Sequence, residues 1–79
     1  MNTATAPATN AEALAATLAR LDAAADFYLA EVNRLDAECV AAKGAGDFDN
    51  LDDLRAERTR ARRLFDFACD RAFALRASR

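Results

Sequence analysis

The 79-residue sequence contains no histidine and no tryptophan, and it has only two cysteines, two glycines and one proline. The missing histidine excludes catalytic pairs that use an imidazole base and zinc sites with imidazole ligands. Two cysteines are too few for a four-cysteine zinc site or a disulfide framework. The chain also has no isoleucine and few turn signals, which argues against a small β protein. We therefore expect no enzyme activity, no metal and no cofactor.

The charge and the N-terminal residues exclude further classes of protein. The formal net charge is −2 and the sequence pI is about 4.9, whereas nucleic-acid-binding domains typically have a pI above roughly 9. The N-terminus lacks the basic start and the apolar run of a secretory signal. No apolar stretch approaches the ~20 residues of a membrane span. These observations predict a cytoplasmic protein without a membrane segment.

Alanine dominates the apolar composition, supplying 22 of the 42 apolar residues. A domain of about 60 residues buries only roughly 60% of its unfolded surface, and each alanine adds little to that burial. We expect so thin a core to need a partner, either a second copy of the chain or another protein.

The spacing of the apolar residues predicts two long helices. We expect residues 1–10 to form a lead-in, and residues 11–79 to form one helical-hairpin domain with helices at 11–43 and 51–77 and a turn at 44–50. Apolar residues recur at alternating spacings of four and three, the pattern of a coiled-coil seam. The seam of the first helix comprises Leu14, Leu18, Leu21, Ala25, Tyr28, Val32, Leu35, Cys39 and Ala42. The seam of the second comprises Leu51, Leu54, Arg58, Ala61, Phe65, Ala68, Ala72 and Leu75.

The helix ends have several candidate capping residues. These are Thr9 or Asn10 before the first helix, Gly44 or Gly46 after it, and Asp47, Asp49 or Asn50 before the second. We expect Phe48 to fold back onto the end of the hairpin.

The short turn makes the two helices antiparallel neighbours, so the predicted fold class is an all-α helical hairpin. Aromatic residues gather away from the turn, in excess of what one seam can bury, and we predict a homodimer that forms a four-helix bundle. Its predicted interface consists of Leu64, Phe65, Cys69, Ala72 and Phe73. Cys69 could form an intermolecular disulfide near the two-fold axis, or it could act only as an interface hydrophobe.

The acidic residues are unevenly distributed along the chain. Residues 44–54 carry four acids and no base, whereas residues 55–79 carry eight bases and three acids. One interpretation is helix-dipole matching and solubility. The other is an acidic face that binds a basic protein surface in competition with nucleic acid. The predicted acidic face consists of Asp22, Asp26, Asp47, Asp49, Asp52 and Asp53.

A run of arginines lies in the second helix: Arg55, Arg58, Arg60, Arg62 and Arg63. As a binding stripe, the run would recognise phosphate or carboxylate groups. As a charge zipper, meaning a row of ion pairs between the two helices, it would form the pairs Asp36–Arg55, Glu31–Arg62 and Glu38–Arg58 with the first helix. Both interpretations remain open at this stage.

The hairpin resembles two groups of known proteins. In its seam spacing, from Leu14 to Ala42 and from Leu51 to Leu75, it resembles Rop-type plasmid RNA-binding proteins, which dimerise into antiparallel four-helix bundles. That resemblance implies an RNA-binding regulator that uses the arginine stripe. In length, acidity and full helicity it is similar to small phage and mobile-element inhibitors, including anti-CRISPR proteins. That similarity implies a non-enzymatic inhibitor whose acidic face occupies a nucleic-acid-binding surface of a host complex. A structural coiled-coil subunit is the third interpretation.

Overall fold

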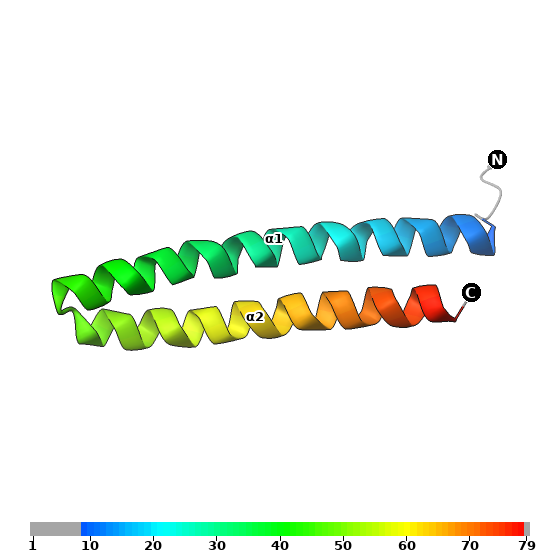
Figure 1. Ribbon diagram of the computed structural model, residues 1–79. Coiled ribbons are helices and arrows are strands. Elements are labelled where there is room, and N and C mark those ends of the chain that lie inside the picture. The colour runs from blue at the N-terminus through cyan, green and yellow to red at the C-terminus, as the bar shows by residue number, and fades with distance from the viewer. Residues whose placement is uncertain (1–8, 79) are drawn as a thin grey trace, which may run out of the picture.

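The chain folds into two antiparallel helices that lie side by side (Figure 1). The computed structural model describes residues 9–78 and is 94% helical. Helix α1 spans Asn10–Ala45 and helix α2 spans Phe48–Ala77. The predicted all-α helical hairpin is therefore confirmed.

Helix α1 begins at a capping box. The Thr9 hydroxyl accepts a hydrogen bond from the Glu12 backbone N–H at 3.0 Å, and the Thr9 backbone N–H donates to Glu12 Oε1 at 3.1 Å. The two residues thus satisfy two N–H groups that the helix leaves without internal partners. The same hydrogen bonds lower the pKa of the Glu12 carboxyl. The first eight residues of the predicted lead-in, 1–10, lie outside the described residues.

The connection between the helices is shorter than the predicted turn. Gly46 has a φ of 73°, the left-handed conformation that ends many helices, and its backbone N–H bonds back to the last turn of α1. Asp47 caps α2 by accepting a hydrogen bond from the Asn50 backbone N–H at 3.4 Å. Because these two residues complete both caps, the helices extend into most of the range 44–50 that the sequence assigned to the turn.

The predicted seam forms the contact between the helices. All nine seam residues of α1 are buried or half-buried, and so are seven of the eight in α2. Arg58 is the exception, because its long side chain leaves the seam and reaches Asp36 at the edge. The alternating spacing therefore identifies the residues that meet in the fold.

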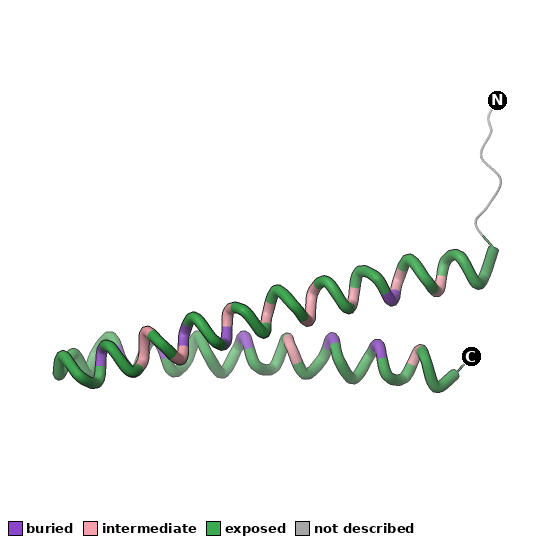
Figure 2. The backbone as a smooth tube through the Cα atoms, turned by 45° about the horizontal axis from the view of Figure 1, so that its top comes forward, coloured by how far each residue is buried: buried purple, intermediate pink, exposed green. Residues whose placement is uncertain are grey.

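The core is concentrated in the half of the hairpin next to the turn. One buried cluster lies there, with Cys39 packed against it: Val32, Leu35, Ala42, Leu51, Leu54 and Ala61. Toward the chain termini, the buried residues of the described chain are Leu18, Ala68 and Ala72 (Figure 2). Because two of these three are alanines, the fully buried core is much thinner in the open half of the hairpin than in the turn half.

Candidate interaction surfaces

Seven large apolar side chains are between 43% and 74% exposed: Phe27, Leu29, Val40, Phe48, Leu64, Phe67 and Phe73. Scattered apolar residues on a surface are ordinary. Five of these seven, however, lie between the middle of the hairpin and its open end, where the core is thin. Phe48 is 63% exposed at the turn, so the expectation that it folds back onto the hairpin end is wrong.

Two hollows lie along the seam. One, of about 240 Å³, is lined by Phe27, Tyr28, Glu31, Leu35, Glu57, Arg60, Ala61 and Leu64. The other, of about 220 Å³, is lined by Val32, Asp36, Arg58, Thr59 and Arg62. The two hollows lie at similar heights along the helices and share no residue, so they open on opposite sides of the seam. We call these the Phe27 side and the Asp36 side.

The Phe27 side carries an exposed apolar patch. Phe27 and Leu64 line its hollow, and Phe67 follows Leu64 by three residues, which keeps both on neighbouring positions of one helix surface. The Phe27 ring packs edge-on against Tyr28, with 5.2 Å between ring centroids. Phe27 and Phe67 are not among the site residues predicted from the sequence. The signal that points to them is a large aromatic residue outside the seam on each helix, at matching heights.

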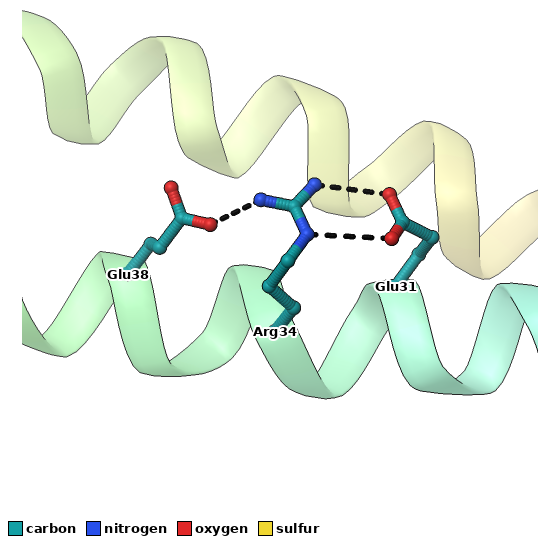
Figure 3. A network of polar contacts seen from close by, with 3 residues as sticks. All are labelled: Glu31, Arg34 and Glu38. Carbon is teal, nitrogen blue, oxygen red and sulfur yellow. Dashed lines mark hydrogen bonds and ion pairs between the residues drawn. The ribbon is translucent and has the colours of Figure 1, made fainter.

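An ion network borders the Phe27 side (Figure 3). Arg34 donates from Nη2 to Glu31 Oε1 at 2.9 Å and from Nε to Glu31 Oε2 at 3.3 Å, and it also contacts Glu38. All three residues belong to α1. The hydrogen bond from Arg34 lowers the pKa of the Glu31 carboxyl and raises the pKa of the guanidinium. Two carboxylates around one guanidinium leave this network with one negative charge.

Two ion pairs cross the seam on the Asp36 side. Arg58 Nη1 lies 2.8 Å from Asp36 Oδ1, and Arg76 Nη2 lies 2.7 Å from Asp22 Oδ2. Asp22 and Asp36 are about four helical turns apart and Arg58 and Arg76 five turns apart, so both pairs lie on the same side. Exposed pairs of this kind each contribute about 0–1 kcal/mol. Their main consequence is that charged side chains bridge the two helices here.

None of the three predicted zipper pairs forms. Arg58 pairs with Asp36, Arg62 with Asp66 at 3.4 Å, and Arg55 lies 4.0 Å from Asp52. Asp36 lies opposite Arg58, one turn beyond Arg55, and Arg34 already binds both Glu31 and Glu38 within α1. Arg60 and Arg63 form no ion pair within residues 9–78.

The five residues of the predicted dimer interface lie in three places. Leu64 lines the Phe27-side hollow, and Ala72 is 3% exposed within the seam. Phe65 is half-buried, and Cys69 and Phe73 are exposed. Phe65, Cys69 and Phe73 lie three, seven and eleven residues after Arg62, which lines the other hollow. Helical periodicity therefore puts all three on the Asp36 side. Cys69 carries a free thiol, as does the half-buried Cys39.

The six predicted acidic residues do not form one continuous face. Four are exposed where the helices join, and we call them the acidic tip: Asp47, Asp49, Asp52 and Asp53. Asp22 is paired with Arg76 near the open end. Asp26 is exposed, and roughly 30 Å of helix separates it from the turn.

No protein-family model, curated protein or solved structure matches the chain. Across residues 9–78, no three His, Cys, Asp or Glu side chains are grouped so that they could hold a metal ion. Neither helix of this described part combines the length and apolarity needed to cross a bilayer. The distinguishing features are therefore a helical hairpin with exposed phenylalanines on both sides of its seam and an acidic tip.

Proposed function

We propose that the chain is a non-enzymatic protein-interaction module that self-associates into a four-helix bundle. The supporting observation is the mismatch between the buried core, which is concentrated next to the turn, and the large apolar side chains exposed around the other half. A helix that is apolar on several sides becomes stable when it packs against further helices. Three of these exposed residues are phenylalanines, Phe27, Phe67 and Phe73, and fully burying one stabilises by about 1.5–3 kcal/mol.

A cytoplasmic location is part of this proposal. Cys69 is an exposed free thiol, and the reducing conditions of the cytoplasm keep such a thiol unpaired.

Self-association is tested by sedimentation equilibrium of the full chain across the micromolar range. We expect the mass to rise from 8.5 kDa toward twice that value. The thermal midpoint should rise with protein concentration, because association stabilises the native state by mass action. A monomer mass at every concentration, with a constant midpoint, would contradict self-association.

A second candidate function, occupation of a nucleic-acid-binding surface on another protein, is favoured by the acidic tip. Its four carboxylates are exposed, and no basic residue occurs between positions 44 and 54. Such a cluster is electrostatically complementary to a basic groove and would exclude nucleic acid from it. This is the anti-CRISPR-like interpretation of the chain.

The acidic-tip proposal is tested by immobilising the chain and exposing it to extract of the source cell. Proteins retained through the tip should be displaced by added DNA or RNA. They should be lost when Asp49→Lys and Asp53→Lys are combined, because these changes remove the negative charge of the tip. Asp47 is left unchanged because it caps α2. Asp26→Lys is the control, since it changes an exposed acid away from the tip. Equal retention by all variants would exclude a role for the tip. The Rop-like alternative predicts that RNA itself is retained, with a steep dependence on salt concentration.

A further inference from the structure

The hairpin has exposed phenylalanines on both sides of its seam, and a two-fold dimer uses one side. We infer that the Phe27 side is the dimer interface and that the second copy packs on it in antiparallel orientation about a two-fold axis. This inference rests on the self-association proposed above.

The Phe27 side is the unobstructed side of the seam. On the Asp36 side, two ion pairs cross from one helix to the other, so charged side chains lie over the groove between the helices there. On the Phe27 side, the ion pairs of the described residues join Arg34 to Glu31 and Glu38 within α1. A second copy can therefore approach the groove between the helices without displacing an interhelical pair.

The hollow on this side is suited to receive a side chain. It lies between α1 and α2, and its lining includes the apolar side chains of Phe27, Leu35 and Leu64. In helix bundles, a side chain of one helix inserts into a hole formed by residues of the facing helices. Phe67 is 65% exposed and lies beside the hollow of its own chain. It is therefore placed to insert into the hollow of the second copy.

The level of the two-fold axis follows from the register of the hairpin. The hollow joins Phe27 to Leu64, and Asp36 lies opposite Arg58. Both observations place Phe27 level with the turn of α2 that carries Leu64 and Phe67. An axis through this level brings the apolar patches of the two copies together.

Charges on the Phe27 side are complementary about this level. Toward the turn, helical periodicity places four acids and two bases there: Glu31, Glu38, Asp53, Glu57, Arg34 and Arg60. Toward the open end, the same periodicity places Arg20 and Arg71 there. The two-fold axis therefore brings the positive part of each copy onto the negative part of the other.

One specific pair follows from this arrangement. A two-fold axis that crosses the helices at this level places α2 of one copy over α2 of the other, and Arg71 and Glu57 are each seven residues from Leu64, in opposite directions. Arg71 therefore comes next to Glu57 of the second copy, and the pair occurs twice in the dimer. Arg20 comes opposite the network of Glu31, Arg34 and Glu38 on α1 of the second copy, which carries one negative charge.

The first test compares two exposed phenylalanines of the same helix by sedimentation equilibrium. Phe67→Ser should weaken the dimer by on the order of tenfold or more, as removal of a central interface aromatic does. Phe73→Ser is the matched control, because Phe73 is 74% exposed on the Asp36 side. Its dimer should be as strong as that of the unmodified chain. Far-UV circular dichroism checks that both variants keep their helices.

The second test is a charge exchange. Arg71→Glu alone should weaken the dimer, because two carboxylates then meet across the interface. Adding Glu57→Arg in the same chain should restore association, since each new arginine faces a new glutamate. A merely structural role for Arg71 would not be rescued in this way.

The outcomes separate the two levels of the proposal. A monomeric unmodified chain overturns self-association itself. A dimer that Phe67→Ser weakens, and that the charge exchange restores, supports the Phe27 side. The assignment of the interface to the Phe27 side is overturned by a different set of results. These are a dimer that Phe67→Ser leaves unaffected, that Phe73→Ser weakens, and that diamide links through Cys69. They would assign the interface to the Asp36 side while leaving self-association intact.

Discussion

Replacing Leu35 with alanine is expected to lower the free energy of unfolding by about 2–5 kcal/mol. Leu35 is 2% exposed, the lowest value in the core, and it belongs to the buried cluster near the turn. Domains have total stabilities of roughly 0.05–0.15 kcal/mol per residue. The loss is therefore a large share of what a chain of 79 residues can have. Urea denaturation followed by circular dichroism, at one fixed protein concentration, measures the change.

Val40→Ala is the matched control for this substitution. Val40 lies in the same helix and also loses methyl groups, but it is 73% exposed. We expect it to change the stability by less than about 0.5 kcal/mol. If the two variants lost equal stability, the core would not lie in the seam where the structure places it.

The two glycines near the turn should respond to alanine in opposite directions. Gly46 has a φ of 73°, and a side chain in this left-handed conformation costs about 1 kcal/mol. Gly44 lies within α1, and a Cβ there would meet no atom within 4 Å. Gly46→Ala should therefore lower the stability, whereas Gly44→Ala should raise it by about 0.5–1 kcal/mol.

The pair forms its own control, because the same chemical change is made two positions apart. Urea denaturation of both variants and the unmodified chain gives the two signs directly. A stabilising Gly46→Ala would show that the helix does not end in the left-handed conformation. A destabilising Gly44→Ala would show that α1 ends before residue 44.

The seam was predictable because it depends only on spacing within each helix. Residues such as Leu35 and Leu54 are marked by their own neighbours, whatever the register of the hairpin. The length of the turn was less predictable, because several residues in 44–50 can serve as caps and the sequence does not show which two act together. Gly46 and Asp47 do so, and the remaining residues of that range are then free to join the helices.

The candidate interfaces were harder to predict, because they depend on which side of the seam a residue occupies. Leu64 and Phe65 are adjacent in the sequence, yet about 100° around the helix separates them. One lines the Phe27-side hollow, and the other turns toward the Asp36 side. The sequence shows more aromatic residues away from the turn than one seam can bury, but not on which side of the seam each of them lies. The spacing leaves Phe27 outside the seam, and only the register of the two helices pairs it with Leu64.

The position of the core beside a two-residue turn also determines the order in which the hairpin closes. Contacts near the turn join residues close in sequence, so little chain entropy is lost in forming them. At the open end, the ion pair between Asp22 and Arg76 joins residues 54 positions apart. We expect the hairpin to zip from the turn outward and its open end to fray first. A partner that covers the open half then holds the free ends of the two helices together, so that its binding and the last step of folding become a single event.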